Sequence, residues 1–211
     1  MTGLIDFVRQ IFIRPIRVIA KYLNRITKGR LHPNAVTLFG LAMHVPIAWL
    51  IITSHWIAAA CALFVFGLLD KLDGELARLQ GRESANGMLL DSVTDRVKEV
   101  ILYVGVAYVF VTSGEGALIT AAVVAALGCS LLTSYLNAMG DAIMARHAQT
   151  REHSANKVFR SGIFAFEVRM AVLFVGLLTG QLAIAIVIIT LGAAYTALGR
   201  LLMVYSKLAV N

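Results

Sequence analysis

The sequence predicts an all-α integral membrane protein, a bundle of six transmembrane helices preceded by an amphipathic interfacial helix. The 211 residues are 59% hydrophobic and their mean hydropathy is +0.79. Only 15% of them are charged, whereas about a quarter is usual in a soluble domain. The Lys and Arg residues also collect in alternate connections. We expect two parts, an amphipathic juxtamembrane helix over residues 1–32 and a transmembrane domain over residues 33–211.

Residues 4–30 mix apolar side chains at helical spacing with basic ones. The basic residues are Arg9, Arg14, Arg17, Lys21, Arg25, Lys28 and Arg30. This pattern is typical of a helix that lies in the membrane interface with its cations facing lipid headgroups. We expect Pro15 to break or kink it.

Six apolar segments follow, and each is expected to cross about 30 Å of hydrocarbon at about 1.5 Å per residue. They cover residues 35–53, 56–79, 87–112, 117–144, 163–179 and 182–205. The connections after the first, third and fifth segments (TSHW, SGEG and TGQ) contain no Lys or Arg. The positive-inside rule therefore predicts cytoplasmic termini, in a cell (inner) membrane. The net charge of +7 then marks a membrane face and not a nucleic-acid surface.

The stretch from Asp70 to Asp95 holds six of the chain's 12 acidic residues. Asp70 and Asp73 share one helix face, and Asp91 and Asp95 share another. The short connection between the two helices makes them antiparallel neighbours, so the acidic faces can meet at the cytoplasmic end. Clustered carboxylates repel one another unless a cation binds them, and they are the oxygen ligands that Mg²⁺, Mn²⁺ or Ca²⁺ prefers.

Two other interpretations of these acids stay open. The aspartates could form salt bridges at helix ends with Arg78, Arg82, Arg96 and Lys98. They could also be the ion site of a cation transporter, although such sites usually lie near the bilayer midplane. These acids lie at one cytoplasmic end instead, which disfavours transport.

The full spacing of this stretch resembles the signature of the CDP-alcohol phosphotransferase (CDP-alcohol phosphatidyltransferase) family at all eight positions. These positions are Asp70, Asp73, Gly74, Ala77, Arg78, Gly87, Asp91 and Asp95. The resemblance implies two Mg²⁺ or Mn²⁺ ions held by the four aspartates, with Asp95 also serving as the general base. It further implies that Asp73, Gly74, Ala77, Arg78 and Gly87 receive the cytidine diphosphate. Asn34 and Thr37, in the Pro33–Thr37 segment, resemble residues that border the nucleotide site.

The resemblance implies a reaction of phospholipid biosynthesis. The acceptor hydroxyl attacks the β-phosphorus of CDP-diacylglycerol, and CMP leaves. We expect a soluble phosphorylated polyol as acceptor, of the inositol phosphate or glycerol phosphate type, with serine or an amino alcohol as the alternative. A catalytically dead homologue is disfavoured because every motif aspartate is present. The family is typically homodimeric, so a homodimer is expected, with membrane lipids and no nucleic acid as further partners.

The expected acceptor site combines Asn137, Arg169 and Arg200. The segment from Ser134 to Asp141 resembles part of the branch that uses inositol phosphate, where Asn137 and Met139 replace basic residues. Arg169 and Arg200 resemble two arginines of its phosphate pocket, although positive-inside anchoring would also explain them. Four basic residues of the fourth connection are expected to contact lipid headgroups: Arg146, Arg151, Lys157 and Arg160.

Overall fold

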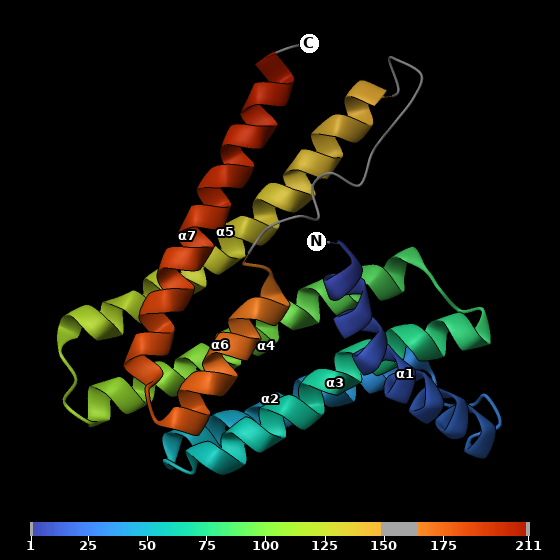
Figure 1. The fold of residues 1–211 in the computed structure, drawn as a ribbon, viewed down its shortest axis with the longest axis horizontal. Coiled ribbons are helices and arrows are strands. Elements are labelled where there is room, and N and C mark those ends of the chain that lie inside the picture. The colour runs from blue at the N-terminus through green and yellow to red at the C-terminus, as the bar shows by residue number, and fades with distance from the viewer. Residues whose placement is uncertain (1, 149–163, 210–211) are drawn as a thin grey trace. The chain divides into compact units, whose positions relative to one another are not determined.

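The regular structure of the described residues is entirely helical, as predicted. The computed structural model describes residues 2–148 and 164–209, and it describes side chains over 14–143 and 164–206. Seven helices lie in this part of the chain (Figure 1). They are α1 (Thr2–Ile26), α2 (Pro33–Ile52), α3 (Trp56–Gln80), α4 (Ala85–Thr112), α5 (Ala117–Ala148), α6 (Phe166–Thr179) and α7 (Leu182–Ala209).

The chain forms two compact units, Met1–Leu102 and Tyr103–Asn211, and α4 contributes residues to both. In the first unit α2 and α1 both pack on α3. In the second unit α5 and α6 both pack on α7. The four motif aspartates all belong to the first unit, whereas Asn137, Arg169 and Arg200 belong to the second.

Within the described residues, three helices are long and apolar enough to cross a membrane. They are α2, α5 and α7, over Pro33–Ile52, Ala117–Ile143 and Leu182–Ser206. The protein is therefore an integral membrane protein with hydrophobic spans. Helices α3 and α4 have the expected bounds, but they carry the charged residues of the acidic stretch. Helix α6 has 14 residues and is about 21 Å long, shorter than its predicted segment and than the hydrocarbon layer.

Pro15 was expected to break or kink α1, and the structure shows no break, because the helix continues through this residue. A proline inside a helix costs about 3 kcal/mol because a backbone hydrogen bond is lost. The turns that follow Pro15 are held by packing, since Ile16 and Ala20 are buried in one cluster with Leu72 and Leu76 of α3. Burial of this apolar face offsets the missing hydrogen bond.

The turn between α3 and α4 is built by a glycine. Gly81 has a left-handed backbone with φ +62°, a conformation that glycine adopts without a Cβ clash. The Arg82 N–H then donates to the Ala77 carbonyl at 2.9 Å, which closes the helix end. Helix α4 begins at Ala85, so the two halves of the acidic stretch are brought back toward each other.

Candidate active site

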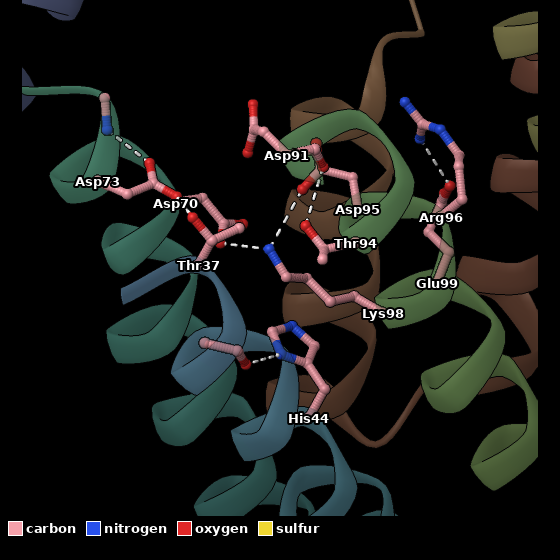
Figure 2. A network of polar contacts seen from close by, with 12 residues as sticks. Thr37, His44, Asp70, Asp73, Asp91, Thr94, Asp95, Arg96, Lys98 and Glu99 are labelled. Atoms are coloured by element: carbon pink, nitrogen blue, oxygen red, sulfur yellow. Dashed lines mark hydrogen bonds and ion pairs between the residues drawn. The ribbon is translucent and has the colours of Figure 1, made fainter. Parts of the chain in front are cut away.

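Four aspartates from two helices form the centre of the candidate site. Asp70 and Asp73 lie on α3, and Asp91 and Asp95 lie on α4. Figure 2 shows their carboxylates facing one another, with the Lys98 side chain reaching between them. They are close enough for Asp73 and Asp95 each to be repelled by Asp70 and Asp91. The predicted meeting of the two acidic faces is therefore present in the structure.

Lys98 is the cation of this cluster. Its side chain has no exposed surface, and its Nζ lies 2.5 Å from Asp70 Oδ1 and 3.2 Å from Asp95 Oδ1. One ammonium group therefore links α3 to α4 (Figure 2). The salt-bridge interpretation holds in this respect, since Lys98 pairs with two of the four aspartates.

Asp73 is held by α2 and by its own backbone. Thr37 Oγ1 donates to Asp73 Oδ2 at 2.5 Å, and the Gly74 N–H donates to Asp73 Oδ1 at 2.6 Å. Both Asp73 and Thr37 are buried, at 6% exposure each. The structure thus places Thr37, expected at the nucleotide site, directly against a motif aspartate, where it fixes the orientation of the carboxylate.

Residues expected to receive the nucleotide gather around the two motif glycines. A Cβ added at Gly87 would lie 3.7 Å from Asn34 Oδ1, so the entry to α2 borders the start of α4. A Cβ added at Gly74 would lie 3.8 Å from Arg78 Nη2, which places the arginine beside the bare backbone of Gly74. Ala77, half-buried on α3, precedes this arginine.

Sequence reasoning missed Glu75, which lies inside the motif. Its side chain is only 8% exposed, although a carboxylate is rarely buried without partners. Arg78 pairs with Glu75 Oε1, and Arg17 Nε of α1 lies 3.3 Å from Glu75 Oε2. The Glu-to-Arg spacing of three residues in α3 was the available signal, since such residues neighbour each other on a helix.

The chemistry of the four carboxylates suits Mg²⁺ or Mn²⁺, since oxygen ligands are the ones that hard divalent cations prefer. The bonds from Lys98 Nζ to Asp70 and Asp95 show that two of these groups already converge on a positive charge. Within the described ranges, no three acidic, histidine or cysteine side chains are gathered closely enough to hold one ion. Binding a metal ion therefore requires side-chain rearrangement among the aspartates, two of which bond Lys98.

The second unit contains two buried arginines, Arg169 and Arg200, at 1% and 8% exposure. Arg169 Nη1 donates to the Phe164 carbonyl at 2.8 Å, and Arg200 Nη1 donates to the Thr133 carbonyl at 2.8 Å. Asn137 follows Thr133 by one turn of α5, and its Oδ1 is buried with no hydrogen-bond partner in the described part of the chain. These three residues were the predicted acceptor site.

Two contacts join Phe164, which lies just before α6, to α7 beside these arginines. The Phe164 N–H donates to Thr196 Oγ1 at 3.3 Å, one turn before Arg200. A Cβ added at Gly192 would lie only 2.6 Å from the Phe164 ring, so glycine is required at this position. The four basic residues expected at lipid headgroups, Arg146, Arg151, Lys157 and Arg160, lie outside the described side chains.

Comparison with known proteins decides the family. Residues 30–204 match the family of CDP-alcohol phosphatidyltransferases. The chain belongs to this family. Its helical fold agrees with that assignment, and the resemblance drawn from the acidic stretch is confirmed. The protein is therefore a CDP-alcohol phosphatidyltransferase, a transferase of phospholipid synthesis.

Several similar proteins within the family are phosphatidylinositol phosphate synthases. The chain is 30% identical over 200 residues to the phosphatidylinositol phosphate synthase of Corynebacterium glutamicum, covering 90% of this chain and 85% of that one. The fold is similar to that of the Mycobacterium tuberculosis phosphatidylinositol phosphate synthase with CDP-DAG bound, at a TM-score of 0.74 and 23% identity over 91% and 94% of the two chains. A structure of the same enzyme with manganese and citrate gives a TM-score of 0.74, at 22% identity over 90% and 88%.

Proposed function

We propose that this CDP-alcohol phosphatidyltransferase transfers a phosphatidyl group from CDP-diacylglycerol to a phosphorylated polyol and releases CMP. The observation that carries the proposal is the meeting of the four signature aspartates of α3 and α4 in one cluster (Figure 2). A site with that many carboxylates favours divalent cations, and divalent cations stabilise the charge of a diphosphate during transfer. The structure of a relative with manganese supports this metal requirement.

The proposed roles of the chain's own residues follow the family signature. Asp95 takes the proton of the acceptor hydroxyl, since a carboxylate within hydrogen-bond reach is a competent general base. Asp70, Asp73, Asp91 and Asp95 would hold two Mg²⁺ or Mn²⁺ ions, which supply charge neutralisation when bound. Thr37 and the Gly74 N–H keep Asp73 in one orientation. Arg78 meets the diphosphate, beside the open backbone at Gly74.

Asn34, Gly87 and Ala77 complete the proposed cytidine diphosphate site. Asn34 Oδ1 borders Gly87, and a side chain at position 87 would also approach Ser84 Oγ to 3.3 Å. The lack of a side chain keeps the backbone of α4 accessible to a ligand, which offsets the cost of about 1 kcal/mol for a helical glycine.

The proposed acceptor carries a phosphate because Arg169 and Arg200 are both buried, and Arg200 bonds the Thr133 carbonyl, one turn before Asn137. Guanidinium groups bind phosphate through paired hydrogen bonds. Relatives named phosphatidylinositol phosphate synthase favour inositol phosphate over glycerol phosphate. Serine or an amino alcohol would present no phosphate to these arginines. CMP release by the purified protein, measured over inositol phosphate, glycerol phosphate, inositol and serine, tests this choice.

The proposal extends to topology and assembly. We infer that α2–α7 form six spans, with α1 in the interface and both termini and the active site on the cytoplasmic side of a cell membrane. The support is the absence of Lys and Arg from the connections after α2, α4 and α6. A homodimer is proposed from the family resemblance.

Replacing Arg169 by alanine is expected to weaken binding of the phosphorylated acceptor more than binding of the donor. A hydrogen bond to a charged group contributes about 1.5–3 kcal/mol, so the acceptor KM should rise on the order of 10- to 100-fold. The KM for CDP-diacylglycerol should change less than about twofold by the same reasoning. Steady-state kinetics with each substrate varied in turn measures both values.

Two controls accompany this experiment. Arg82→Ala removes an exposed arginine that bonds Gln80 and should leave both KM values unchanged. Arg169→Lys keeps the charge but loses the planar fork and should give an intermediate acceptor KM. Equal increases for donor and acceptor in Arg169→Ala would count against the acceptor assignment.

Replacing Lys98 by methionine is expected to destabilise the metal-free protein. Removing one partner of a buried ion pair costs about 3–5 kcal/mol, and Asp70 and Asp95 would be left without their shared counter-charge. Saturating Mn²⁺ should recover much of the loss because it replaces that charge. Thermal unfolding in detergent, with and without Mn²⁺, measures the difference.

Lys21→Met is the matched control, since Lys21 is exposed on α1. It should unfold at the wild-type temperature under both conditions. A Lys98→Met protein that unfolds like wild type without metal would show that the bonds to Asp70 and Asp95 do not stabilise the fold.

A further inference from the structure

A buried carboxylate inside the signature joins two arginines. Glu75 lies on α3 between Gly74 and Arg78, and its side chain is 8% exposed. Arg78 Nη1 bonds Oε1, and Arg17 Nε bonds Oε2 at 3.3 Å. Each oxygen of Glu75 therefore has one arginine partner, and the two partners come from different helices. Glu75 is not one of the eight signature positions.

Arg17 is brought to this place by the packing of α1 along α3. Ile16 and Ala20, on either side of Arg17, are buried with Leu72 and Leu76. Further along both helices, Gln80 Nε2 donates to Asn24 Oδ1 at 2.9 Å and to the Leu31 carbonyl at 3.0 Å. Helix α1 is thus fixed to α3 by an apolar face that lies between two polar contacts. Its register places Arg17 at Glu75.

These contacts decide the position of Arg78. The Arg78 side chain is 57% exposed, so without a fixed partner it would sample many rotamers. Glu75 holds it beside Gly74, the open backbone proposed to face the diphosphate. Arg17 bonds the other oxygen of Glu75, so the carboxylate is held between the two guanidinium groups. Glu83 is a second carboxylate partner of Arg78, 3.5 Å from its Nε, but its side chain is 68% exposed.

We propose that Glu75, supported by Arg17, positions Arg78 for the diphosphate of the donor, and that α1 is thereby part of the CDP-diacylglycerol site. Glu75 and Arg17 are positioning residues, because both act through Arg78. The inference rests on the proposed function, in which Arg78 meets the donor. It adds a role for α1 beyond lying in the membrane interface.

The test separates donor binding from turnover. Full-length Glu75→Gln and Arg17→Met proteins are assayed in detergent with Mn²⁺, varying CDP-diacylglycerol and acceptor in turn. We expect the KM for CDP-diacylglycerol to rise on the order of tenfold in Glu75→Gln and about threefold in Arg17→Met, since a misplaced Arg78 loses a charge-assisted hydrogen bond. The kcat and the acceptor KM should stay within about twofold of wild type, because the groups that move the proton are untouched.

Matched variants make the result specific. Arg14→Met removes another exposed arginine of α1 and should behave as wild type. Arg17→Lys keeps a cation at Glu75 and should restore most of the donor affinity. Because Arg17 is 53% exposed, its variants test the inference even if Glu75→Gln does not fold.

Two outcomes would overturn the inference. One is an unchanged donor KM in both Glu75→Gln and Arg17→Met, and the other is an Arg17→Met protein indistinguishable from Arg14→Met. These outcomes are distinct from failure of the proposed function. That failure would appear as a wild-type protein that releases no CMP from CDP-diacylglycerol with any acceptor.

Discussion

An Asp95→Asn protein is expected to lose turnover by on the order of 10³-fold while it still binds CDP-diacylglycerol. The amide has nearly the shape of the carboxylate, and its oxygen can still accept the bond from Lys98 Nζ, which lies 3.2 Å from Asp95 Oδ1. It cannot take a proton from the acceptor hydroxyl. The kcat should therefore fall far more than the donor KM changes, and single-turnover CMP release measures the loss.

Glu115→Gln is the matched control for this experiment. It converts a carboxylate to an amide in the exposed connection between α4 and α5, and full activity is expected. An Asp95→Asn protein that keeps more than about a tenth of wild-type turnover would rule out Asp95 as the general base, since such a group contributes at least about 10²-fold.

Removal of divalent metal ions is expected to abolish turnover. The four aspartates and Lys98 together carry a formal net charge of −3, and the donor diphosphate is also negative. Without cations the donor would be repelled from the site, whereas two divalent ions would make the cluster net positive. We expect a chelator to reduce CMP release by at least about 10³-fold, since metals contribute several kcal/mol to such transfers.

Readdition of Mg²⁺ or Mn²⁺ should restore the rate, and readdition of Na⁺ at equal ionic strength should not. The Asp91→Asn protein should need a higher Mn²⁺ concentration for half-maximal rate, because one oxygen ligand is lost. Full turnover in excess chelator would contradict the role proposed for the aspartate cluster.

Most helix bounds could be predicted from the sequence because apolar runs in a membrane protein are long and clearly interrupted. The ends of α2, α3, α5 and α7 follow the predicted segments within a few residues. Two details could not be predicted. Helix α1 continues through Pro15 because tertiary packing of Ile16 and Ala20 outweighs a local preference. Helix α6 begins only at Phe166, and apolar composition alone does not mark that start.

The candidate site was predictable where it depends on spacing along a helix. Fixed offsets place Asp70 with Asp73 and Asp91 with Asp95, and a short connection brings the pairs together. The partners of long side chains were less predictable. Lys98 reaches Asp70, 28 residues away, and this pairing depends on how α3 and α4 pack. The Glu75 contact to Arg17, 58 residues away, depends on the docking of α1.

Identification of the lipid product tests the central claim most directly. Purified protein is given CDP-diacylglycerol, Mn²⁺ and inositol phosphate, and both CMP and the lipid are quantified by mass spectrometry. The proposed function predicts equal amounts of CMP and of a phosphatidyl lipid that retains the acceptor's phosphate, with neither formed from free inositol. Release of CMP without a new phosphatidyl lipid, or equal product from inositol and inositol phosphate, would contradict it.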